Sequence, residues 1–118
     1  MPWGLALLPG GDLLVTSRDT RQIWRINLES GHRTRLGKIT EASSNGSAGG
    51  EGGLLGIAVS PDFSQDHRLF IYYSTADDNR IAGLTYHPTR AAGRQLSRPT
   101  VILNDIPHGL HHNGGRIA

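Results

Sequence analysis

Histidines gather near the C-terminal end of the chain, in the stretch His108–Arg116, which reads HGLHHNGGR. Three of the six histidines of the protein fall within it. Because neutral histidine titrates near physiological pH, it can accept or donate a proton there. The glycines beside it let a ligand approach the backbone closely. The stretch is therefore either a site of proton transfer or a polar loop that happens to be rich in histidine.

The same histidines suggest a metal site at first sight, but their pattern argues against one. The sequence contains no H-E-x-x-H motif, and the local pattern is not helical. Adjacent residues of a strand point to opposite faces, so His111 and His112 are not expected to share one ion. We therefore assign no metal ligand in this chain. A G-x-S-x-G nucleophile elbow is also absent, which argues against serine-based hydrolysis.

A second polar stretch, residues 40–53, is the longest one without helix or strand signals. It carries Glu51 among four glycines, at positions 49, 50, 52 and 53. The Glu51 carboxylate could be solvated, could accept hydrogen bonds from a polyol, or could bind a metal. A phosphate cradle is excluded, because no Lys-Ser/Thr pair follows and no helix is expected to begin there.

Length and composition limit the elements that can position these loops. The 118 residues are enough for one small domain with a modest core. The net charge of +2 comes from scattered basic residues, which does not favour nucleic-acid binding. Without cysteine there is no disulfide scaffold and no thiolate site. The first apolar run is cut by Pro9 and is too short for a membrane span or a signal peptide.

Sixteen glycines, six prolines and the lack of a clean 3.6-residue apolar period predict an all-β protein. The stretch Trp3–Pro9 repeats as Leu55–Pro61, 52 residues later, and Arg116–Ala118 resembles the start of a third copy. Each of the first two copies is followed by three further strand-like runs. These are Leu13–Ser17, Gln22–Leu28 and Thr34–Ile39 in the first unit, and Leu69–Ser74, Arg80–Tyr86 and Thr100–Leu103 in the second.

Four antiparallel strands in each unit of about 50 to 60 residues are typical of β-propeller blades. A β-sandwich is the alternative, and the internal repeat favours the propeller. We predict a partial β-propeller over residues 1–118, with blade 1 at about 3–40, blade 2 at about 54–104 and the start of blade 3 at about 114–118. Because propellers typically have four to eight blades, two blades indicate a fragment, or a short protein that associates with itself to close the ring.

The two polar loops occupy equivalent places, each between the last strand of one blade and the first strand of the next. They are therefore expected to emerge at the same end of the blades, where a rigid scaffold presents a binding site. Glu51 and His112 are predicted to face a common cavity.

The motifs resemble, in order and over the whole chain, the N-terminal third of the soluble glucose/sorbosone (aldose sugar) dehydrogenases. The Gly-Gly-Leu-Leu-Gly and His-x-x-Gly-Arg elements are the specific parts of this resemblance. The matching segments are Pro2–Ala6, Leu13–Thr16, Glu51–Ala58, Pro61–Phe63 and His112–Ile117. The resemblance implies a six-bladed propeller that uses pyrroloquinoline quinone (PQQ) and calcium. It also implies a periplasmic or extracellular location.

By the same resemblance, His112 is the catalytic base and touches the cofactor. It would take the proton from the anomeric hydroxyl of an aldose while a hydride passes to the quinone. Glu51 and His111 are implied to contact the sugar. Some members of the family carry glutamine at the first position, and the glucose enzyme has a carboxylate that supports the base at the second. Arg116 is expected to hold its loop to the next strand.

The resemblance places most cofactor and calcium ligands in later blades, so the 118 residues alone are expected to be inactive. The electron acceptor is not indicated. The alternative function is a non-catalytic propeller segment that binds carbohydrate or a partner protein.

Overall fold

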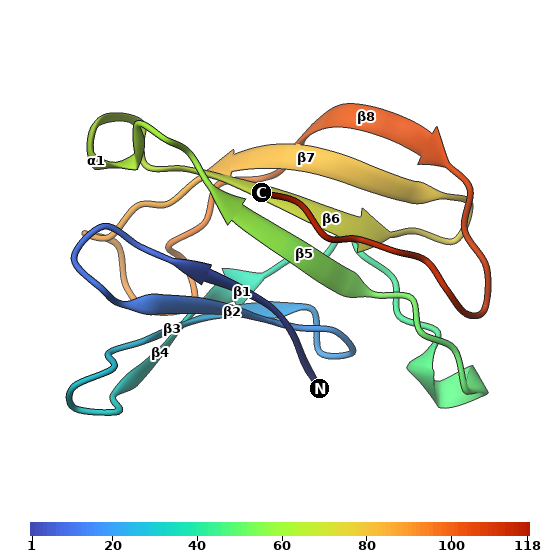
Figure 1. Ribbon diagram of the computed structural model, residues 1–118, viewed down its shortest axis with the longest axis horizontal. Coiled ribbons are helices and arrows are strands. Elements are labelled where there is room, and N and C mark those ends of the chain that lie inside the picture. Colours follow the sequence, from blue (N-terminus) through green and yellow to red (C-terminus); the bar gives the residue numbers. More distant parts are fainter.

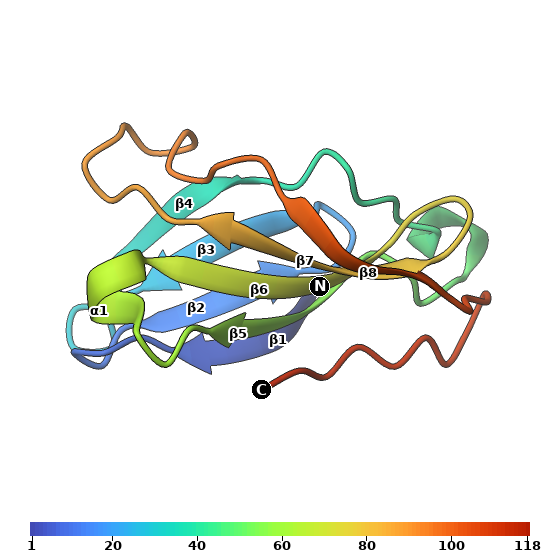
Figure 2. The same cartoon turned by 90° about the horizontal axis from the view of Figure 1, so that it is seen from above.

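The computed structural model describes residues 1–118 as two four-stranded antiparallel sheets, each in sequence order (Figure 1). The sheets are stacked as two layers, and in the view from above the second sheet lies in front of the first (Figure 2). The predicted all-β fold is confirmed. The strands of the first sheet are β1 (Pro2–Leu7), β2 (Leu13–Ser17), β3 (Gln22–Ile26) and β4 (Arg33–Lys38). Those of the second are β5 (Leu54–Val59), β6 (Arg68–Ser74), β7 (Asn79–Thr85) and β8 (Thr100–Ile106).

Two short helical turns interrupt segments that the sequence pattern assigns to loops. A four-residue helix, α1 (Phe63–Asp66), fills the connection after β5, and a 3₁₀ turn, η1 (Gly46–Ala48), lies within the loop that carries Glu51. Both are too short to produce a 3.6-residue apolar period, which is why the pattern gives no signal for them. Strand β8 also runs three residues beyond the expected end at Leu103.

The register of the strands reproduces the internal repeat. The pairing of β1 with β2 is shifted between Pro2 and Leu5, and that of β5 with β6 is shifted between Leu54 and Ile57. The two irregularities are therefore 52 residues apart, as the sequence repeat is. Because a bulge re-aims the strand that contains it, the same bend recurs in the first strand of each sheet.

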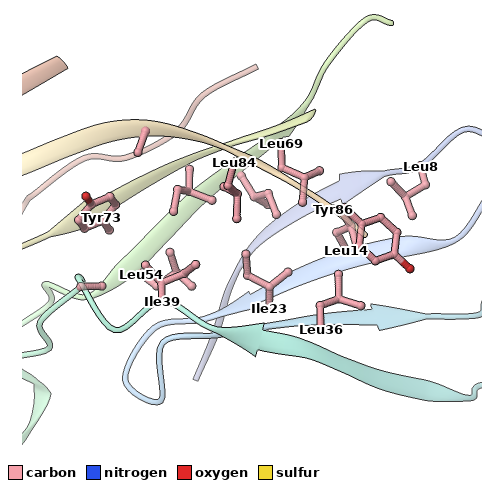
Figure 3. Packing of buried hydrophobic residues seen from close by; sticks show 14 of the residues in the cluster. Leu8, Leu14, Ile23, Leu36, Ile39, Leu54, Leu69, Tyr73, Leu84 and Tyr86 are labelled. Atoms are coloured by element: carbon pink, nitrogen blue, oxygen red, sulfur yellow. The ribbon is translucent and has the colours of Figure 1, made fainter. Parts of the chain in front are cut away.

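The hydrophobic core lies between the two sheets (Figure 3). In the first sheet Leu14, Ile23 and Leu36 point toward the second, whose Leu69 and Leu84 point back. All five side chains are almost fully buried. Alternate residues of a strand face opposite sides of its sheet, so each sheet uses one face for this shared core. The two blades are thus one packed unit.

At the boundary between the blades, a glycine allows close backbone approach. A Cβ atom on Gly4 would lie 2.6 Å from the carbonyl oxygen of Leu55, nearer than side-chain carbons ever come. The buried hydroxyl of Thr16 joins the same two strands, because it accepts a bond from the Gly4 N–H (2.8 Å) and donates to the Leu55 carbonyl (2.6 Å). Glycine and hydroxyl together bind β1 and β2 to β5.

The C-terminal segment repeats this boundary one blade later. After β8 the chain turns back and runs beside β5 to its end at Ala118 (Figure 1). A Cβ atom on Gly56 would collide with the carbonyl oxygen of Gly115. The Tyr72 hydroxyl, at the position in β6 that corresponds to Thr16 in β2, donates to the Asn113 carbonyl (2.8 Å). Residues 113–117 therefore lie against the second blade as β5 lies against the first.

Candidate active site

The two polar loops meet at one end of the blades, as the sequence predicts. The backbone N–H of Glu51 donates to the Leu110 carbonyl at 2.6 Å. The His111 ring nitrogen Nε2 lies 3.1 Å from the Gly49 carbonyl oxygen. Two bonds thus join the loop that precedes blade 2 to the loop that follows it.

His112 stands out at this end through its backbone and its exposure. Its φ angle is +62°, in the left-handed region that non-glycine residues seldom occupy. Its side chain is exposed and makes no hydrogen bond within the chain. The imidazole is therefore available to an external ligand, with both ring nitrogens unoccupied.

The other predicted site residues are placed differently from one another. The Glu51 side chain is exposed and makes no hydrogen bond, so its carboxylate is available as an acceptor. The His111 ring uses Nε2 in the loop contact, which leaves Nδ1 for a ligand. Its centroid is 6.3 Å from that of the His112 ring. His108 is exposed, with Nε2 3.1 Å from the Ala76 carbonyl oxygen, and belongs to the loop scaffold.

A cavity of about 260 Å³ beside these loops is not the expected common cavity of Glu51 and His112. Neither residue lines it. Two of its hydroxyl groups are already engaged within the chain: that of Ser44 donates to Asp19 and that of Ser74 to Asn79. The lining residues are Ser43, Ser44, Asn45, Ser74, Thr75, Ala76, His108 and Gly109. This cavity is therefore part of the support of the loops.

The turn between β6 and β7, at the same end, is held by a buried carboxylate. Asp78 is 4% exposed and accepts bonds from the Thr75 hydroxyl (2.6 Å), the Asp105 N–H (2.7 Å) and the Arg80 guanidinium (2.9 Å). The Thr75 bond, followed by those from Asp105 and Arg80, lowers the pKa of Asp78. The carboxylate is therefore ionised and fixes this turn to the end of β8.

The side chains at this end can be compared with the ligands that calcium and PQQ, the cofactors implied by the sequence resemblance, would need. No three His, Asp or Glu side chains are grouped so that they could hold a metal ion, and calcium needs six to eight oxygen ligands. These residues alone do not fit a calcium site. PQQ presents carboxylate and quinone oxygens, which fit the unoccupied imidazole of His112. Arg116 is a second exposed donor, and it makes no hydrogen bond that would hold its loop to the next strand.

Asn113 and its partners are the part of this region to which the sequence pattern assigns no role. Asn113 is 8% exposed and Asn79 is fully buried. The Asn79 amide donates to the Asn113 side-chain oxygen at 3.2 Å, and the Tyr72 hydroxyl donates to the Asn113 carbonyl. The asparagine next to the candidate base was visible in the sequence, but the residues that contact it lie 34 and 41 positions earlier.

Comparison with known proteins decides which family carries this architecture. The family model for glucose/sorbosone dehydrogenase matches residues 1–118. The chain belongs to the glucose/sorbosone dehydrogenase family. The predicted resemblance is confirmed, and the two sheets are blades of an incomplete propeller.

Curated relatives of this dehydrogenase family are considerably longer than the chain. It is 29% identical to quinoprotein glucose dehydrogenase B of Acinetobacter calcoaceticus, over 98% of this chain and 24% of that protein. It is 34% identical to aldose sugar dehydrogenase YliI of Escherichia coli K12, over 99% of this chain and 32% of that protein. The 118 residues therefore span 24% and 32% of the length of these two dehydrogenases.

Solved structures of glucose/sorbosone dehydrogenases share the fold. The PQQ-bound aldose sugar dehydrogenase of Streptomyces coelicolor superposes with a TM-score of 0.92 at 49% identity, over 98% of this chain and 33% of that one. A putative glucose dehydrogenase of Thermus thermophilus gives a TM-score of 0.74 at 31% identity, over 98% of this chain and 32% of that one. The chain contains no helix long and apolar enough to cross a membrane.

Proposed function

We propose that this chain forms part of the sugar-oxidising site of a PQQ-dependent aldose dehydrogenase, with His112 as the general base. The observation that carries the proposal is the His112 imidazole, which is exposed and unbonded where the two blade-joining loops meet. An imidazole can accept a proton from a hydroxyl group that it faces, as a general base does. His112 would take the proton of the anomeric hydroxyl of an aldose.

Glu51 and His111 are proposed to orient the sugar. The unbonded Glu51 carboxylate can accept hydrogen bonds from sugar hydroxyls. The Nδ1 atom of His111 is available for the same purpose, while Nε2 holds the loop. Bound PQQ would supply the acceptor for the two electrons, with His112 as its contact in this chain.

The remaining parts of the proposal concern the whole protein. We propose that residues 114–118 begin a third blade, because Gly115 packs on Gly56 as Leu55 packs on Gly4. Further blades would carry the calcium ligands and the other PQQ contacts. A periplasmic or extracellular location follows from the family resemblance.

The test replaces His112 by alanine in the natural gene product that carries these residues, loaded with PQQ and calcium. Sugar-dependent dye reduction is expected to fall by about 10²- to 10⁴-fold, the usual contribution of a general base. His108→Gln is the matched control, since it changes a neighbouring histidine that contacts only a backbone carbonyl. Turnover that survives His112→Ala would remove His112 from the reaction. Sugar binding without turnover in the unmodified protein would favour a non-catalytic module.

A further inference from the structure

We propose that Asn113 and Tyr72 are positioning residues for His112, and that they fix its imidazole by locking the loop on both sides of it. This inference rests on the proposed function, because it assigns to a buried network the task of orienting the proposed base. Neither residue touches the reacting atoms in this role.

The first step of the argument is the backbone of His112. A non-glycine residue with φ of +62° has an unfavourable backbone conformation, which persists only where its surroundings impose it. The His112 side chain makes no hydrogen bond, so it does not impose the conformation itself. The constraint must come from its neighbours in the chain.

The second step is a closed loop around His112. The Asn113 side-chain oxygen accepts the Gly109 N–H at 2.9 Å, and the Asn113 amide group donates to the Gly109 carbonyl at 2.9 Å. The Asn113 side chain thus acts as both acceptor and donor toward the backbone of Gly109, four positions earlier. His112 is held inside this five-residue ring, and its side chain is left exposed.

The third step is the attachment of the ring to blade 2. The Asn113 carbonyl accepts the Tyr72 hydroxyl at 2.8 Å, and the Asn113 side-chain oxygen accepts the Asn79 amide at 3.2 Å. The same Asn79 amide group also lies 3.1 Å from the Pro107 carbonyl. The loop is therefore bound to β6 and β7 before and after the histidines. Burial raises the pKa of Tyr72, so its hydroxyl remains a proton donor at neutral pH.

The fourth step is the comparison of the two blade boundaries. Thr16 and Tyr72 occupy equivalent positions in β2 and β6, and both donate a hydroxyl to a backbone carbonyl of the chain that enters the next blade. Thr16 reaches Leu55, within a strand. Tyr72 is longer and reaches Asn113, next to His112. The hydroxyl-to-carbonyl bond of the first boundary thus recurs at the second, where it binds the loop that contains the proposed base.

The repeat provides a matched pair of variants for the test. In the PQQ-loaded natural protein, Tyr72→Phe removes only the hydroxyl that holds Asn113, and Thr16→Val removes the equivalent hydroxyl, which holds Leu55 within strand β5. Both are expected to lower the unfolding midpoint. Only Tyr72→Phe is expected to lower kcat, by about 10- to 100-fold, because misplacement of a catalytic group by about 1 Å has effects of that size. KM is expected to change less than about twofold, since the sugar contacts remain.

The outcomes separate this inference from the proposed function. Asn113→Ala should reproduce the kcat loss of Tyr72→Phe, and if it does not fold, Tyr72→Phe decides alone. Unchanged kcat in Tyr72→Phe, or an equal kcat loss in Thr16→Val, overturns the positioning role. Retained turnover in His112→Ala overturns the proposed function instead, whatever Tyr72→Phe shows.

Discussion

Gly56 is the position at which the blade boundary and the candidate site can be perturbed together by one methyl group. In Gly56→Ala the new Cβ atom would collide with the Gly115 carbonyl oxygen and lie 3.3 Å from the Ile117 side chain. The first obstacle is backbone, so no rotamer change relieves it. The segment after His112 would have to move by about 1.5–2 Å to reach an ordinary contact distance. Overpacking of this kind costs about 1–3 kcal/mol of folding free energy.

The expected result is therefore a lower unfolding midpoint together with a loss of turnover. Because a misplacement of 1 Å can already lower kcat by about 10²-fold, a larger shift in the segment that begins three residues after His112 is expected to lower kcat by at least that factor. Urea unfolding followed by tryptophan fluorescence measures the first effect, and dye-linked sugar oxidation by the PQQ-loaded natural protein measures the second.

Gly31→Ala is the control for Gly56→Ala. Gly31 lies in the turn between β3 and β4 and has a φ of +74°, and a Cβ atom added to it would have no neighbouring atom within 4 Å. Alanine there should cost about 1–2 kcal/mol through backbone strain alone and leave kcat unchanged. If Gly56→Ala retains both its unfolding midpoint and its kcat, the close packing of the C-terminal segment on β5 does not hold.

Three further predictions concern charge and chain length. The pKa of Asp78 is lowered in the folded protein. The contribution of Asp78 to stability should therefore be complete above its unfolded pKa of about 3.9, and should vanish as the pH falls through the lower folded pKa. In Asp78→Asn, Tm should fall less steeply as the pH is lowered than it does in the unmodified protein. The Arg98–Glu41 pair joins an arginine that is 91% exposed, so Arg98→Ala should change the free energy of unfolding by less than about 0.5 kcal/mol in urea titrations. The 118 residues alone, mixed with PQQ and calcium, should give no sugar-dependent dye reduction, because they lack a grouped set of metal ligands; a clear rate would refute this.

Most of the fold could be predicted from the internal repeat, because the repeat consists of short segments that can be recognised in the sequence. The Gly4 and Gly56 positions, 52 residues apart, were visible as letters in equivalent heptapeptides, and the strands built from them have the same bulge. The short elements α1 and η1 produced no periodic signal. The end of β8 was missed because Asn104 and Asp105 interrupt an otherwise apolar run, and Asp105 is paired through its N–H with the distant Asp78.

The candidate site was predictable only in part, for a physical reason that Asn113 illustrates. An exposed His112 can be proposed from its own chemistry, since titration near neutral pH is a property of the residue type. The role of Asn113 depends instead on which groups its amide meets, and those belong to Tyr72 and Asn79 on other strands. Local sequence can thus suggest a candidate base, whereas the contacts of Asn113 become visible only in the tertiary structure.

Thr16 and Tyr72 make the same kind of bond at the two blade boundaries, but they bind different parts of the incoming chain. In both blades a glycine in the first strand allows the next segment to approach closely, and a hydroxyl group from the second strand donates a hydrogen bond to a carbonyl of that segment. At the first boundary the incoming segment is already a strand, so a short side chain suffices. At the second it is a loop, and the longer tyrosine reaches it. A blade boundary therefore provides a rigid attachment for a loop whose adjacent residue, His112, is left exposed for chemistry.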